Sequence, residues 1–153
     1  MDYLASGIKT IKLDKRYEHF YTIINNATSA TIHEIFLLCL SIGFKKNRRK
    51  ETGTLGTKKF RTSYLTQKDR EFMYSIIIQI DKDNFFTNIV EPSFQKEMEK
   101  TLISYANGGS EILIEEVIKD NWIESSEIID SHIKDLDLEL AKYIYQELEA
   151  IPF

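Results

Sequence analysis

One apolar helix limits the fold of this chain more than any other segment. Residues 31–44 read TIHEIFLLCLSIGF, and their apolar side chains recur at spacings of three and four and also spread around the helix. A helix that is apolar on nearly all sides usually lies in the middle of a core. Thr31 and Glu34 form a capping box that predicts its start, and Gly43 predicts its end.

The segments on either side of this helix have the same helical periodicity. Apolar residues recur every three or four positions in each of them, and Asp14, Thr66 and Pro92 are residue types that favour helix starts. Asn25 and Asn26 predict the end of the first helix. Helices are therefore predicted at 14–25 and 31–42, from Thr66, from Pro92, at 110–121 and at 130–150.

The boundary between the helix that starts at Pro92 and the helix at 110–121 is assigned to Asn107-Gly108-Gly109. Glycine adopts the left-handed conformation of a helix C-cap at no steric cost. We therefore expect the chain to leave the first helix at these residues and to start a short new helix at Ser110.

Composition agrees with one mainly helical domain. The chain has 153 residues, of which 42% are hydrophobic and 12% aromatic, so it can bury a core of its own. Residues 9–13 (KTIKL) alternate polar and apolar side chains, which predicts a short strand or an extended segment. We expect an all-α fold over residues 1–153, an irregular single-domain bundle of five to seven helices with this one short strand.

Residues 45–63 (KKNRRKETGTLGTKKFRTS) break the helical pattern. Eight of these nineteen residues are Lys or Arg and one is Glu, while two glycines and four threonines argue against a helix. We expect an exposed, mobile loop or hairpin with a strong positive charge.

Charge is divided unevenly along the chain, although the net charge is only −4. Residues 1–68 carry 13 basic and five acidic side chains, and residues 69–153 carry seven basic and 19 acidic side chains. Such an asymmetry indicates interaction with a charged partner. The alternative is that the basic and acidic halves attract each other within one fold.

The basic segment predicts binding to nucleic acid, because clustered cations neutralise phosphates and release counterions. Phe60 and Tyr64 lie within or beside it, and aromatic rings between cations suit stacking on unpaired bases. The predicted nucleic-acid-binding residues are Lys45, Lys46, Arg48, Arg49, Lys50, Lys58, Lys59 and Arg61.

The order strand, helix, helix at the N-terminus also follows that of a ribbon-helix-helix unit. In that unit, paired strands from two subunits enter the major groove. This hypothesis places Lys9, Thr10 and Lys12 near DNA and makes the protein a homodimer.

No pattern of catalytic or metal-binding residues stands out. The three histidines are scattered, GTLGTKKF departs from the phosphate-binding loop pattern, and the acidic pairs of the last third lie on polar helix faces. Cys39 is expected to be a buried apolar residue. We therefore predict no catalytic residue, no metal, no cofactor and no enzymatic activity.

The sequence also lacks the roughly 18 unbroken apolar residues of a membrane span, and it does not begin with a signal peptide. A cytoplasmic protein without a membrane partner is expected.

Three segments resemble a family of small bacterial proteins, the Dnd system-associated proteins of the type numbered four, which are found beside DNA phosphorothioation and restriction systems. The segments are YEHFYTIINN with TIHEIFLLCLSIGFKKN, the basic linker after them, and ISYANGGSEILIEEV, within about residues 11–118. The resemblance implies an accessory factor in antiviral defence that acts on DNA or on other defence-system proteins. It supplies no catalytic residue.

The leading hypothesis is thus a non-enzymatic accessory protein that binds DNA through the basic loop. A protein–protein adaptor that docks through its acidic C-terminal helices is the first alternative. A metal-dependent nuclease is the second.

Overall fold

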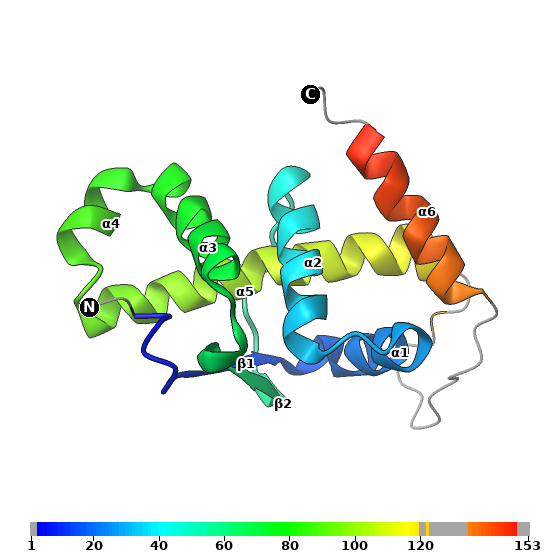
Figure 1. The fold of residues 1–153 in the computed structure, drawn as a ribbon, viewed down its shortest axis with the longest axis horizontal. Coiled ribbons are helices and arrows are strands. Elements are labelled where there is room, and N and C mark those ends of the chain that lie inside the picture. The colour runs from blue at the N-terminus through cyan, green and yellow to red at the C-terminus, as the bar shows by residue number, and fades with distance from the viewer. Residues whose placement is uncertain (1–2, 120–121, 123–134, 150–153) are drawn as a thin grey trace.

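The computed structural model describes residues 3–119, 122 and 135–149 (Figure 1). These residues form a mainly α-helical fold with six α-helices and one small sheet, as the helical periodicity predicts. The elements in chain order are β1 (Thr10–Asp14), α1 (Glu18–Thr28), α2 (Ile32–Lys45), β2 (Leu55–Arg61), α3 (Gln67–Ile80), α4 (Lys82–Asn88), α5 (Pro92–Leu113) and α6 (Leu136–Glu149). Short 3-10 turns at Lys15–Tyr17 and Thr62–Tyr64 follow the two strands, and a π-helical turn at Ile114–Ile118 follows α5.

The fold is built around the crossing of α2 over the long helix α5, which extends across most of the molecule (Figure 1). Phe36, Cys39 and Leu40 on α2 are fully buried, which confirms the central place predicted for this helix. Helices α1 and α6 pack at one end of α5, while α3 and α4 pack at the other (Figure 1). The sequence therefore located the middle of the core correctly.

The predicted break at Asn107-Gly108-Gly109 is wrong, because α5 runs through these residues without interruption to Leu113. All three residues are buried. A Cβ atom on Gly109 would lie 1.8 Å from the carbonyl oxygen of Cys39, so glycine serves here to let two helices touch. Consequently there is no separate helix at 110–121; a π-helical turn follows α5, and residues 120 and 121 lie outside the described part.

Gly43 was also assigned the wrong role. Helix α2 continues past it to Lys45, and a Cβ atom at Gly43 would lie 1.9 Å from the carbonyl oxygen of Tyr105 on α5. The glycines of α2 and α5 thus face each other at the crossing.

Several predicted helix starts are confirmed by their hydrogen bonds. Thr66 caps α3 by accepting from the Asp69 amide at 3.1 Å, and Pro92 occupies the first turn of α5. The predicted start of α1 at Asp14 is wrong, because Asp14 ends β1 and caps the 3-10 turn, and α1 begins at Glu18. Helix α1 ends at Thr28, three residues beyond the predicted end at Asn25, with Ser29 in the left-handed region at φ 61°. The last helix begins at Leu136 among the described residues, and the predicted positions 130–134 and 150 lie outside them.

Of the exposed, mobile loop or hairpin predicted at 45–63, Lys45 belongs to α2, residues 48–54 are neither helix nor strand, and residues 55–61 form the strand β2. Strand β2 pairs antiparallel with β1, the predicted short strand. The ladder has a bulge, because the register shifts between Lys12 and Asp14. The two strands lie at the edge of the molecule away from the free end of α6 (Figure 1).

No single helix in the described ranges is long and apolar enough to span a membrane. The segments Lys15–Thr28 and Ile32–Lys45 reach that length and hydropathy only as a pair, with a bend of 110° between them.

Candidate nucleic-acid interface

The eight predicted nucleic-acid-binding residues separate into two groups. The first group contains the last residue of α2 and the cations just after it: Lys45, Lys46, Arg48, Arg49 and Lys50. Three of the five pair with carboxylates of the acidic half. The ammonium groups of Lys45 and Lys46 lie 3.3 Å and 3.0 Å from the carboxylate of Glu147 on α6, and Lys45 also donates to the Glu147 carbonyl at 2.6 Å. Burial would raise the pKa of Glu147, but these two lysines outweigh it and lower the pKa below the ordinary value.

Arg48 is held by two carboxylates on the C-terminal part of α5 and the turn that follows. Its guanidinium donates to both oxygens of Glu115, at 2.7 Å and 2.6 Å, and to Glu111 at 3.1 Å. The bond from Arg48 lowers the pKa of Glu115. The other Glu111 oxygen accepts from the Tyr17 hydroxyl at 2.7 Å, so Arg48 is part of a network that joins three segments of the chain.

Arg49 and Lys50 lie where the chain runs along α5. The Arg49 guanidinium lies 4.9 Å from the centre of the Tyr105 ring, and its Nε donates to Ser104 Oγ at 3.0 Å. The Lys50 amide donates to the Ser104 carbonyl at 3.0 Å, and its own carbonyl accepts from Asn107 at 3.2 Å. The ammonium of Lys50 makes no salt bridge with a described carboxylate.

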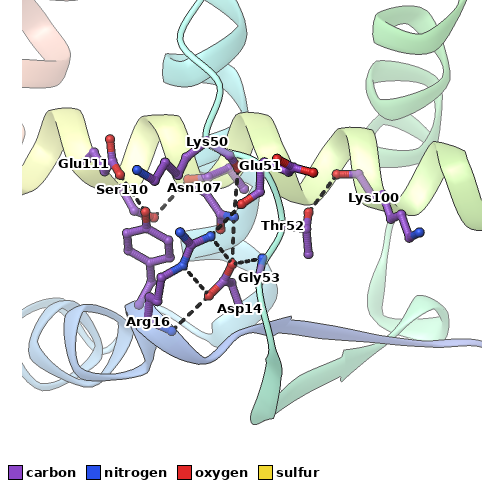
Figure 2. Close-up of polar contacts among 12 residues, drawn as sticks. Asp14, Arg16, Lys50, Glu51, Thr52, Gly53, Lys100, Asn107, Ser110 and Glu111 are labelled. Carbon is purple, nitrogen blue, oxygen red and sulfur yellow. Dashed lines mark hydrogen bonds and ion pairs between the residues drawn. The ribbon is translucent and has the colours of Figure 1, made fainter.

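A buried carboxylate anchors this part of the chain from the other side (Figure 2). Asp14 is 1% exposed and accepts from the Arg16 side chain, from the Gly53 amide at 2.8 Å and from Asn107 at 3.1 Å. Burial would raise the pKa of Asp14, but the bonds from Arg16 and Gly53 outweigh it and lower the pKa. The segment 48–54 is therefore clamped between Asp14 and α5, in contrast to the mobile loop that was predicted.

The second group of cations lies on β2, and its geometry follows from the strand register. Lys12 lies opposite Lys59, Ile11 opposite Phe60, and Thr10 opposite Arg61. The pair that follows Thr10–Arg61 is Lys9–Thr62, and it is hydrogen-bonded, since the Thr62 amide donates to the Lys9 carbonyl at 2.9 Å. Hydrogen-bonded and non-hydrogen-bonded pairs alternate in an antiparallel ladder, so Lys12–Lys59 and Thr10–Arg61 are non-hydrogen-bonded pairs, whose Cα atoms lie about 4.5 Å apart.

The two faces of this ribbon differ completely. Ile11 and Phe60 point inward and are 1% and 3% exposed, and the Phe60 ring lies 5.1 Å from that of Phe36 on α2. The other face carries four exposed polar residues, which we call the ribbon face: Thr10, Lys12, Lys59 and Arg61.

The cations of the ribbon face have no acidic counterpart among the described residues. No salt bridge joins Lys12, Lys59 or Arg61 to a carboxylate within the described ranges. Like charges directly opposite each other destabilise a sheet by an amount of the order of 0.2–1 kcal/mol. The fold thus keeps an unfavourable contact at an exposed place where an acidic or neutral residue would be better for stability.

Lys58 differs from its neighbours because it lies in the bulge. The amides of Thr57 and Lys58 donate to the same Glu18 carboxylate oxygen, at 2.6 Å and 3.2 Å. Burial would raise the pKa of Glu18, but these bonds and the nearby Lys58 charge lower it. The Lys58 amide therefore helps to hold the bulge, and Lys58 is half-buried, whereas Lys59 is exposed.

The two aromatic residues proposed to stack on bases have different positions. Phe60 is in the core, so that prediction is wrong for Phe60. Tyr64 is 58% exposed, with its ring 5.7 Å from that of His33, and it lies beyond the end of β2.

Strand pairing also departs from the ribbon-helix-helix hypothesis, because β1 pairs with β2 of the same chain and not with a strand of a second subunit. Two of the residues that it places near DNA, Thr10 and Lys12, are exposed on the ribbon face. The remaining signal was present at Lys59, Phe60 and Arg61, where polar and apolar side chains alternate.

The described residues hold no group of three or more His, Cys, Asp or Glu side chains that could bind a metal. Cys39 is buried, and burial raises its pKa to about 12, which agrees with the expected apolar role and not with a nucleophile.

Comparison with known proteins does not extend these observations. No protein-family model, curated protein or solved structure matches the chain.

Proposed function

We propose that this protein binds nucleic acid, with DNA as its target and the ribbon face as its contact surface. The observation that carries the proposal is the cross-strand pair Lys12–Lys59 with Arg61 beside it, exposed and without an acidic counterpart in the described part of the chain. A polyanion would turn this repulsive arrangement into a favourable one, because each phosphate contact releases counterions.

The proposed contact surface does not include the first basic group, although the sequence predicted that group to bind nucleic acid. Lys45, Lys46 and Arg48 already pair with Glu147, Glu111 and Glu115, and DNA would have to compete with those carboxylates. These pairs support the alternative that the two halves of the chain attract each other, but only for this group. Of the eight residues predicted, Lys59 and Arg61 remain the best supported, and Lys12 joins them.

An accessory role without catalysis follows from the resemblance to the Dnd system-associated proteins. In that role the protein would deliver or stabilise DNA for other members of a bacterial DNA-modification or antiviral system.

The direct test is a fluorescence-anisotropy titration with short duplexes at several salt concentrations. We compare the wild type with a ribbon variant (Lys12→Ala, Lys59→Ala, Arg61→Ala) and with a control that loses three exposed cations elsewhere (Lys68→Ala, Lys82→Ala, Lys96→Ala). Because each lost phosphate contact removes about 0.9 from the logarithmic salt slope, the ribbon variant should lose between two and three from that slope. The control should keep it.

Two outcomes would overturn the proposal. One is absence of binding by the wild type at low salt, which would favour a protein–protein adaptor. The other is an equal loss of affinity in both variants, which would show that only net charge matters.

A further inference from the structure

We infer that the ribbon face reads B-form duplex DNA from the major groove, with Arg61 as the residue that contacts base edges. This inference rests on the proposed function and specifies its substrate. It depends on the shape of the ribbon, on the absence of stacking groups from its outer face and on the chemistry of Arg61.

The shape of the ribbon matches one groove only. The described sheet has two strands, β1 and β2, and strands lie about 4.8 Å apart. The major groove of B-form DNA is about 12 Å wide and admits a two-stranded ribbon, whereas the minor groove is about 6 Å wide. In A-form RNA the major groove is too deep and narrow for side chains to read.

The ribbon is mounted so that its outer face can enter such a groove. Its inner face is fixed to α2 through Phe60 and Phe36, and its bulge is fixed to α1 through Glu18. The strands lie at the edge of the molecule (Figure 1), and Lys12, Lys59 and Arg61 are exposed. The fold thus presents a rigid ribbon whose position does not depend on ordering a loop.

Single-stranded nucleic acid is a poor match to the same face. Proteins that bind single strands combine cations with aromatic rings on which the bases stack. The ribbon face contains no aromatic residue, because Phe60 points into the core. Tyr64 is exposed but lies in the 3-10 turn after β2, against His33.

Arg61 has the chemistry of a base-reading residue. A guanidinium donates two parallel hydrogen bonds to O6 and N7 of guanine, which is the commonest specific contact in the major groove. Arg61 is exposed and forms no salt bridge among the described residues, in contrast to Arg16 and Arg48, which are held by carboxylates. Lys12 and Lys59 would supply charge beside it.

The first experiment compares one sequence as duplex DNA, duplex RNA and single-stranded DNA in the anisotropy titration. We expect duplex DNA to bind at least about 10-fold more tightly than the other two. Saturating the duplex with netropsin, which occupies the minor groove, should leave the affinity unchanged.

The second experiment tests Arg61 itself, using a guanine-rich duplex in which 7-deazaguanine replaces every guanine. This base keeps pairing and charge but lacks the N7 acceptor in the major groove. The wild type should bind the modified duplex about 10-fold more weakly, in the range set by one bidentate contact. Arg61→Ala removes the donors that would reach N7, so it should bind both duplexes nearly equally, although more weakly than the wild type binds the unmodified duplex.

The outcomes separate this inference from the proposed function. If the wild type binds none of the three nucleic acids, the proposed function fails. If it binds duplex DNA through the ribbon but tolerates 7-deazaguanine, is displaced by netropsin, or prefers single strands or RNA, nucleic-acid binding stands and major-groove recognition is overturned.

Discussion

At the scale of single residues, the polar groups that matter most are the ones the fold has buried. Asp14 was identified from the sequence as a helix cap, and it does accept from the Arg16 amide at 3.0 Å. Its larger role is to bind Gly53 and Asn107, which are far from it in the sequence. A buried carboxylate with this many donors stabilises the fold only while it is ionised.

Replacing Asp14 with alanine should therefore lower the free energy of unfolding by about 3 kcal/mol, because the Gly53 amide loses its acceptor, Arg16 loses its carboxylate, and Asn107 keeps only the Lys50 carbonyl. Urea denaturation at neutral pH measures this change. Glu51→Ala removes an exposed acid from the neighbouring segment and should change stability by less than about 0.5 kcal/mol. Equal effects of the two substitutions would contradict the anchoring role.

The pH dependence of stability should follow the same residue. The folded pKa of Asp14 lies below its ordinary value of 3.8, so its stabilisation is complete above about pH 4 and is lost as the pH falls through the folded pKa. The wild type should thus lose stability below pH 4, and Asp14→Ala should lose less over the same interval. Denaturation midpoints between pH 2 and 7 give the comparison; parallel curves would count against it.

Glu99 should give stability a pH dependence opposite to that of Asp14, with stability falling as the pH rises. Burial raises its pKa from 4.5 to about 7, so the folded state favours the neutral acid. The unfavourable charge appears as the pH rises from about 4.5 to 7, and stability should fall over that interval. Glu99→Gln should be more stable than wild type by about 1 kcal/mol at pH 8 and equal to it at pH 4. A constant difference at both values would show that charge is not the cause.

At the scale of elements, the crossing of α2 and α5 depends on glycines that sequence patterns assign to helix ends. Gly43 and Gly109 allow the backbones of α2 and α5 to touch. Any larger residue would prevent this, since a Cβ atom at either position would lie within 2 Å of a carbonyl oxygen of the other helix. Neither helix ends there, because the helical hydrogen bonds continue and the missing side chains are needed for packing.

Gly109→Ala provides a test in which two effects have opposite signs. Helix propensity alone predicts a gain of about 1 kcal/mol, because alanine is the better helix former. The clash with Cys39 predicts a loss of several kcal/mol or failure to fold, because α2 and α5 must separate. Thermal unfolding followed by circular dichroism distinguishes them. Gly53→Ala is the control, since the atoms nearest to its Cβ would be those of the flexible Arg16 side chain at 3.3 Å, and it should fold normally.

At the scale of the whole molecule, some cations of the basic half form salt bridges with the acidic half, and others do not. Lys45, Lys46 and Arg48 bind the acidic side chains of α5 and α6 and of the turn after α5. The ribbon face lies outside these contacts. Function and stability should therefore respond to different cations.

Arg48→Ala should lower the free energy of unfolding by about 1 kcal/mol, because Glu111 and Glu115 lose their partner, and should change DNA affinity less than twofold. The ribbon variant should show the reverse, with weaker DNA binding and unchanged or slightly higher stability because the Lys12–Lys59 repulsion is removed. Urea denaturation and anisotropy titration on both variants complete the comparison. If Arg48→Ala lost DNA binding without losing stability, residues 45–50 and not the ribbon face would be the DNA-contacting surface.

The sequence by itself determined the helical class, the central place of α2 and the starts of α3 and α5, because caps and helical periodicity act over a few neighbouring residues. It also identified the positive charge of residues 45–61. Only the tertiary structure decided which of those cations are neutralised, since Glu111, Glu115 and Glu147 lie far along the chain. It likewise decided that glycine serves a helix crossing and that β2 pairs with β1, because both contacts join residues more than 40 positions apart and no local pattern encodes them.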